Sequence, residues 1–164
     1  MANEQSKIHP PFLPVLIGTG LGSGFFPWGP GTAGAILATA IWYVLWMYLS
    51  PFTLVVVTAA LILIFTLLGT WATSKLTPYW GDDPHRVVVD EMVGVWIPLL
   101  LATDGLTALL SLLLFRFFDI LKPLGIRAID RKKGAFWVMF DDILAGIYSA
   151  IVLFVIVQAY SLLK

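Results

Sequence analysis

Two long stretches of this chain carry no charged side chain. No Asp, Glu, Lys or Arg occurs in residues 8–74 or in residues 143–163. A helix needs about 20 apolar residues to cross the hydrocarbon core of a bilayer, at about 1.5 Å of rise per residue. A helix at the surface of a soluble domain carries polar residues on its outer face, and these stretches are too long to lack them. The pattern therefore predicts an integral membrane protein.

The apolar residues divide into five segments. These segments cover residues 33–49, 52–73, 92–103, 105–118 and 143–163. The third and fourth are short for complete spans, so they either extend into flanking residues or form a short helical hairpin. We predict an all-α, multi-pass membrane helical bundle with about four to five membrane segments including a short helical hairpin, in a single domain that covers residues 1–164.

The basic residues predict how the bundle is oriented. Nine of the ten Lys and Arg residues lie on the side of the N-terminus and of the loops after the second and fourth segments. Only Lys164 lies on the other side. Basic residues near membrane segments favour the cytoplasmic side. We therefore expect the polar loops to face the cytoplasm and the turns at residues 50–51 and 104 to face outward.

The composition excludes several functional classes. Ten basic and ten acidic residues give zero formal charge, and 59% of the chain is hydrophobic. Disordered chains are poorly hydrophobic and strongly charged, and nucleic-acid binders carry a basic surplus. We therefore expect no nucleic-acid partner. The chain has no cysteine and only two histidines, so a bound metal ion would have oxygen ligands.

Two pairs of adjacent acids stand next to apolar segments. Asp90–Glu91 precedes the third segment and Asp141–Asp142 precedes the fifth, and we expect each pair to begin its helix. Taken singly, each acid fits a helix cap, because acidic residues are favourable at helix N-termini. Taken together, crowded carboxylates repel one another, and a divalent cation removes that repulsion. Ligation by oxygen alone favours Mg²⁺, with Mn²⁺ as the alternative.

A third polar motif follows the fourth segment. Arg116, Asp119 and Lys122 are spaced three residues apart and form one stripe on a helix, which Pro123 ends. The stripe is either a ladder of salt bridges or a carboxylate flanked by two cations. Two such cations would suit a phosphate group, because they bind its charge and stabilise a phosphoryl-transfer transition state.

Residues 18–34 contain seven glycines. They match no dinucleotide-binding fingerprint, because no strand precedes them. We expect Thr32, after Pro30 and Gly31, to cap the first membrane helix at its cytoplasmic end. There, backbone N–H groups can receive a phosphate. Close packing of helices through small residues explains the same pattern, and both interpretations stay open.

A basic run, Arg131–Lys133, lies beside the apolar residues Phe136 and Trp137. We expect this segment to lie on anionic lipid headgroups. Asp130 precedes the run, and we expect the neighbouring cations to satisfy its charge. Asp130 is therefore left outside the predicted site.

Four motifs together resemble one protein family. They are Gly-Ser-Gly-Phe-Phe-Pro-Trp-Gly-Pro-Gly-Thr at 22–32, Val-Asp-Glu-Met-Val-Gly at 89–94, Phe-Arg-Phe-Phe-Asp-Ile-Leu-Lys-Pro at 115–123 and Met-Phe-Asp-Asp-Ile-Leu-Ala-Gly at 139–146. Over about residues 16–150 the chain resembles phosphatidylglycerophosphatase A. The resemblance implies a Mg²⁺-dependent lipid phosphatase of the bacterial inner membrane. Its reaction would convert phosphatidylglycerophosphate to phosphatidylglycerol and phosphate.

The resemblance also implies the roles of individual residues. The catalytic and metal-binding acids would be Asp90, Glu91, Asp119, Asp141 and Asp142. The phosphate-binding residues would be Arg116, Lys122, Ser23, Gly31 and Thr32, and Asp83 would be a further acidic position. The chain departs from the family at residues 133–137, where a single glycine replaces a Gly-Gly-rich turn. That departure bears on loop geometry and on headgroup preference.

The residues leave the mechanism and two other classes of protein open. Attack by water, with a metal ion and a carboxylate base, is our first hypothesis; an aspartyl-phosphate intermediate is the second. An ion-coupled transporter would use the boundary carboxylates as an ion path, but it would also need ionisable groups near the bilayer midplane. A non-catalytic scaffold would not need so many acids in one layer. The expected partners are a phospholipid substrate and the bilayer, and the oligomeric state is open.

Overall fold

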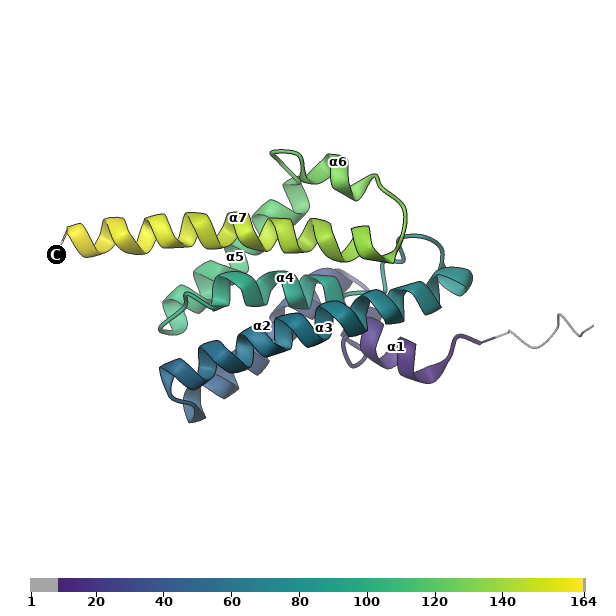
Figure 1. The fold of residues 1–164 in the computed structure, drawn as a ribbon, viewed down its shortest axis with the longest axis horizontal. Coiled ribbons are helices and arrows are strands. Elements are labelled where there is room, and N and C mark those ends of the chain that lie inside the picture. The colour runs from purple at the N-terminus through teal and green to yellow at the C-terminus, as the bar shows by residue number, and fades with distance from the viewer. Residues whose placement is uncertain (1–8, 164) are drawn as a thin grey trace, which may run out of the picture.

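The computed structural model describes residues 9–163, which contain helices and no strand. The two cations at the chain ends, Lys7 and Lys164, entered the charge count and lie outside the described residues. The elements are α1 (Phe12–Gly18), the 3₁₀ helix η2 (Ser23–Phe25), α2 (Pro30–Tyr48), α3 (Pro51–Trp80), α4 (Val89–Leu99), α5 (Gly105–Leu121), α6 (Ile126–Asp130) and α7 (Ala135–Leu162) (Figure 1). The all-α prediction is confirmed.

Three of these helices have the length and apolarity of membrane spans. They are α2, α3 and α7, with 19, 30 and 28 residues. Large apolar side chains such as Leu67 and Val155 are exposed along α3 and α7, as expected for surfaces that contact lipid. The helices α4 and α5, with 11 and 17 residues, form the predicted short hairpin. The prediction of a helical membrane bundle is confirmed.

The turn between α2 and α3, the turn between α4 and α5, and the end of α7 lie at the same end of the molecule, on the left in Figure 1. Ser50 caps α3 by accepting a hydrogen bond from the Thr53 backbone, and Asp104 forms a capping box with Thr107 at the start of α5. Trp46 Nε1, near the end of α2, donates to the Thr103 carbonyl at 3.1 Å and so connects the end of α2 to the turn before α5. Both turns therefore share one face, as predicted from the sequence.

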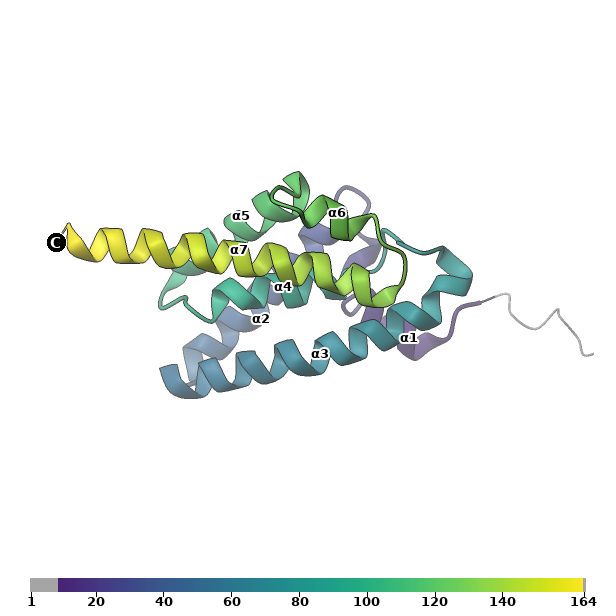
Figure 2. The ribbon, with the colours of Figure 1, turned by 45° about the horizontal axis from the view of Figure 1, so that its top comes forward.

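Helix α4 lies at the centre of the bundle, packed against α2, α3, α5 and α7 (Figure 2). Trp96 Nε1 donates to the Ala38 carbonyl of α2 at 3.0 Å. On the other side, a Cβ atom at Gly146 would overlap the backbone at Gly94, and one at Gly94 would lie 2.8 Å from the Asp142 carbonyl oxygen. These two glycines let the backbones of α4 and α7 touch. That contact sets how far the acids of α4 lie from those of α7.

Two predicted helix starts are wrong. Helix α7 begins at Ala135 after Gly134, so Asp141 and Asp142 lie nearly two turns inside it and cap nothing. The helix starts earlier because residues 135–140 are apolar and contain no Pro or Gly that would separate them from the helix after the acids. Helix α2 begins at Pro30 with Gly29 as its N-cap, so Thr32 is not the cap. Proline has the φ angle of the first helical turn already fixed, which starts the helix three residues earlier.

Candidate active site

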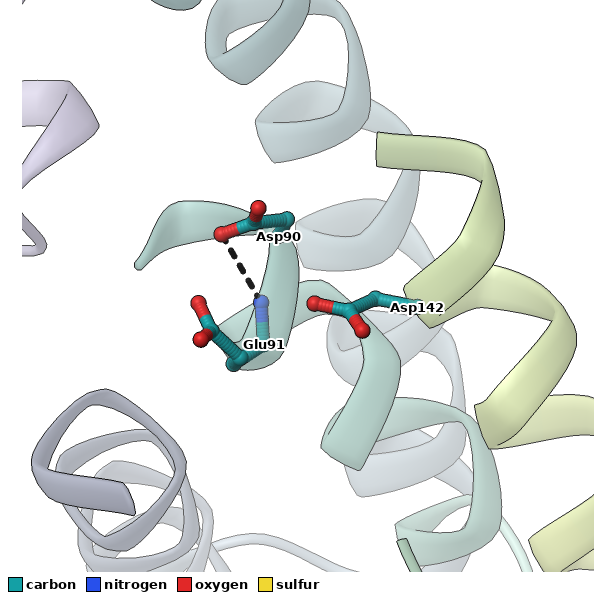
Figure 3. Close-up of side chains that lie close together, drawn as sticks. All are labelled: Asp90, Glu91 and Asp142. Carbon is teal, nitrogen blue, oxygen red and sulfur yellow. Dashed lines mark hydrogen bonds between the residues drawn. The ribbon is translucent and has the colours of Figure 1, made fainter. Parts of the chain in front are cut away.

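Three carboxylates meet where α4 begins. Asp90 and Glu91 lie in the first turn of α4, as predicted, and Asp142 reaches them from α7. One oxygen from each lies within 4.8 Å of the others, and Figure 3 shows the three groups directed toward a common space. The Glu91 backbone N–H donates to Asp90 Oδ1 at 3.2 Å. We call Asp90, Glu91 and Asp142 the acidic triad.

The acidic triad is largely shielded from solvent and has few hydrogen-bond partners, with Glu91 as its half-buried member. Asp90 is 7% exposed and Asp142 is 4% exposed. Glu91 Oε2 is buried and accepts no hydrogen bond within residues 9–163. Several ionised carboxylates held together away from water are costly unless a cation neutralises them. The triad therefore has the ligand chemistry and the unmet charge of a site for a metal ion.

The other two predicted acids are paired with cations of the chain itself. Asp119 accepts a hydrogen bond from Arg116 one turn earlier on α5. Asp141 Oδ2 accepts from Lys122 Nζ at 2.7 Å. The sequence interpretation placed all five acids in one ligand set. Among residues 9–163 the structure gives the five acids two environments: the triad carboxylates form no salt bridge, whereas Asp119 and Asp141 each pair directly with a cation.

Lys122 connects the end of α5 to both neighbouring segments. It is the C-cap of α5 in the left-handed conformation, with φ of 46°. Its ammonium donates to Asp141 and also to Asp130 of α6. Burial opposes the charge on Lys122, but these two hydrogen bonds outweigh burial and raise the pKa of Lys122 above its ordinary value. These contacts hold the positively charged Lys122 ammonium between Asp130 and Asp141, next to the acidic triad.

These groups line one cavity of about 550 Å³. Its walls come from the start of α2, the loop between α3 and α4, the end of α5, and the segment from α6 into α7. The acidic triad, the Arg116–Asp119 pair and Lys122 with Asp141 all face it. The cavity thus combines a metal-type carboxylate cluster with two cations, which is an arrangement suited to a phosphate ester.

Comparison with known proteins identifies the family. The model of the phosphatidylglycerophosphatase A family matches residues 16–157. The chain belongs to the phosphatidylglycerophosphatase A family. Two relatives carry that name: one from Haemophilus influenzae, 40% identical over 86% of this chain and 86% of its own length, and one from Escherichia coli K12, 32% identical over 95% and 89%.

A third relative has a different name. The protein from Bacteroides thetaiotaomicron is 57% identical over 88% of this chain and 94% of its own length. It bears the provisional name phosphatidylinositol-3-phosphatase. No solved structure matches the chain.

In this member of the phosphatidylglycerophosphatase A family, most of the predicted site residues line the cavity and two do not. All five acids line the cavity, together with Arg116, Lys122, Gly31 and the exposed Asp83. Ser23 and Thr32 do not line it. Ser23 Oγ donates to the Gly20 carbonyl at 2.9 Å and so stabilises its own loop. Sequence reasoning missed Asp130, which was assigned to the basic run after it and instead pairs with Lys122 from an earlier helix.

Gly31 matters to the cavity because it has no side chain. The first turn of α2 lies against Glu91, and a Cβ atom at Gly31 would overlap the Glu91 carboxylate. The same atom would lie 3.2 Å from Arg116 Nη1. Glycine therefore lets α2 lie against the Glu91 carboxylate in its present position. The packing interpretation of the glycine-rich motif therefore holds at this position.

Proposed function

We propose that this chain removes the terminal phosphate of phosphatidylglycerophosphate and releases phosphatidylglycerol and inorganic phosphate. The observation that carries the proposal is the buried acidic triad next to Arg116 and Lys122 in one cavity, in a chain of this family. Both features suit phosphomonoester hydrolysis, because the negative charge of the transition state is spread over the phosphoryl oxygens, where a metal ion and cationic side chains stabilise it.

The acidic triad is the proposed site of a Mg²⁺ ion. Asp90, Glu91 and Asp142 offer only carboxylate oxygens, and Mg²⁺ is a hard cation that prefers oxygen ligands. When bound, the ion supplies positive charge to the phosphate and to the attacking oxygen. The unpartnered Glu91 Oε2 is the acceptor most in need of such a ligand.

The chain's own residues divide the remaining work. Arg116 and Lys122 bind phosphate oxygens and orient phosphorus toward a water molecule. The Asp119 carboxylate accepts the proton of that water as its oxygen attacks phosphorus. The ester bond to the glycerol oxygen breaks, and that oxygen leaves with a proton returned by Asp119. In the alternative route an aspartate oxygen attacks phosphorus itself, and an acid-stable trapped phosphoprotein would distinguish this route.

We expect phosphate release to depend strictly on a divalent cation. The purified protein, assayed with phosphatidylglycerophosphate in detergent micelles, should lose activity in a chelator and regain it with excess Mg²⁺. The reason is that three crowded carboxylates cannot bind a phosphate without a neutralising cation. Full activity in the chelator would rule out the metal site. Ion flux in liposomes without any phosphate release would favour the transporter hypothesis.

A second candidate substrate is a phosphatidylinositol phosphate. The observation that favours it is the name of the 57% identical Bacteroides relative. Both lipids present a phosphomonoester on a hydroxylated headgroup, so the same acids and cations serve either. The phosphate-release assay decides between them. A higher kcat/KM for phosphatidylglycerophosphate supports the first substrate, and a higher value for phosphatidylinositol 3-phosphate assigns the second.

We further propose that the cavity faces the cytoplasm at the bacterial inner membrane. The basic residues around the cavity support this orientation. The chain is free of cysteine, so single cysteines at Ser50 and Asp82 can be labelled with a membrane-impermeant reagent. Position 50 should react in intact cells, and position 82 only after permeabilisation. Labelling of position 82 in intact cells would reverse the topology.

A further inference from the structure

Asp130 is an acid that the proposed reaction does not use. It is the last residue of α6, which packs against α7, and it lines the cavity. Its carboxylate accepts a hydrogen bond from Lys122 Nζ, which also donates to Asp141. The Asp130 side chain is 30% exposed and that of Lys122 is 23% exposed, so the pair lies in the cavity wall rather than in open solvent.

The chain between α5 and α6 is built to place Asp130 there. After the left-handed Lys122, Leu124 and Gly125 also have positive φ angles, and the backbone doubles back on itself. The Arg127 N–H donates to the Lys122 carbonyl at 3.3 Å, and Tyr148 of α7 donates to the Leu124 carbonyl at 3.1 Å. The buried Ile126 anchors α6 in the core. The turn is therefore fixed to both α5 and α7.

Two carboxylates on one ammonium give a defined position to a flexible side chain. Lysine has three N–H donors, and here two are used by Asp130 and Asp141. The third is left for an oxygen of the substrate. With Asp141 alone, the long lysine side chain would keep several rotamers and would be held less well against the cavity.

We propose that Asp130 is a positioning residue that acts through Lys122. It holds the Lys122 ammonium, together with Asp141, in the place where a phosphate oxygen binds. The inference rests on the proposed function, because Lys122 is assigned there as a phosphate-binding residue. Asp130 itself touches neither substrate nor metal in this assignment.

The consequence is a particular kinetic signature. A lysine that binds phosphate equally in the ground state and the transition state changes KM and leaves kcat nearly constant. In Asp130→Asn we expect KM for phosphatidylglycerophosphate to rise by about tenfold and kcat to change by less than about threefold, as expected for a weakened charge-assisted hydrogen bond. Asp130→Glu keeps a carboxylate on a longer side chain and should restore most of the loss.

The decisive experiment is a double-mutant cycle of Asp130→Asn and Lys122→Met, measured as kcat/KM. If Asp130 acts through Lys122, removing Asp130 has no further effect once Lys122 is gone. Asp104→Asn, at the opposite end of the bundle, is the matched control and should match wild type. Thermal unfolding in detergent reports whether each variant is folded.

The outcomes separate this inference from the proposed function. If wild type releases phosphate and Asp130→Asn keeps a normal KM, the positioning role is wrong and the proposed function stands. An Asp130→Asn effect of equal size in the Lys122→Met background also overturns it, because the role would then be structural. Wild type without phosphate release from either lipid would refute the proposed function itself.

Discussion

Asp142→Asn is expected to lower phosphate release by about 100-fold or more, because even groups that only orient a metal ligand cost roughly 10–100-fold. Asp142 is buried in the acidic triad and forms no salt bridge within residues 9–163. Asparagine keeps the shape of the side chain and removes the charge that holds a cation. Raising Mg²⁺ should restore part of the activity by mass action. The measurement is turnover as a function of Mg²⁺ concentration.

Two further variants make this result specific. Asp119→Asn should also be strongly impaired, but Mg²⁺ should not restore it, because Asp119 is paired with Arg116 and is assigned as the base. Asp104→Asn should stay within a few-fold of wild type, since asparagine caps a helix about as well as aspartate. Normal turnover with a normal Mg²⁺ dependence in Asp142→Asn would contradict the assignment of the acidic triad as the metal site.

The sequence was sufficient to predict the membrane segments and the layer of acids. Uncharged runs such as residues 8–74 depend on the bilayer alone, so they can be recognised without knowing the packing. The Asp90–Glu91 pair at the start of α4 was predicted for the same reason, since it marks where an apolar segment begins. Both features are local, and local features are what a sequence shows directly.

The division of the acids between metal and cations depends on packing. Asp141 and Asp142 are adjacent, so their side chains leave α7 in directions about 100° apart, and in this bundle the two directions lead to different partners. Asp142 faces α4, and Asp141 faces Lys122. The start of α7 at Ala135 places both acids in the body of the helix, and its packing against α4 and Lys122 then assigns each acid its partner. The sequence interpretation placed both acids at the start of this helix and in one metal site, so it did not distinguish their partners.

The role of Asp130 could not be predicted from spacing. Its partner Lys122 is eight residues earlier, across a turn with three positive φ angles at Lys122, Leu124 and Gly125. Non-glycine residues such as Lys122 and Leu124 rarely adopt positive φ angles, so the sequence did not predict them at these two positions. The nearer cations at Arg131–Lys133 were the natural partners on sequence alone.

Gly31→Ala is expected to reduce kcat/KM by about 100-fold, the cost of displacing a catalytic group by about 1 Å. The added Cβ would occupy the space of the Glu91 carboxylate, so either Glu91 leaves the acidic triad or α2 moves away from α4. Alanine is the better helix former by about 1 kcal/mol, so propensity alone would predict a stabilised protein. A loss of activity in Gly31→Ala would therefore reflect the steric effect of the added Cβ, because helix propensity alone favours alanine.

Gly105→Ala is the matched control for this prediction. Gly105 begins α5, lacks a positive φ angle, and a Cβ there would meet only Tyr43 at an ordinary 3.7 Å. That variant should keep wild-type turnover and an equal or higher unfolding temperature. Gly31→Ala should instead need more Mg²⁺ for half-maximal activity, because Glu91 is one of the three proposed ligands. Normal turnover with an unchanged Mg²⁺ requirement in Gly31→Ala would mean that Glu91 works from another position, and the close approach of α2 would then serve packing alone.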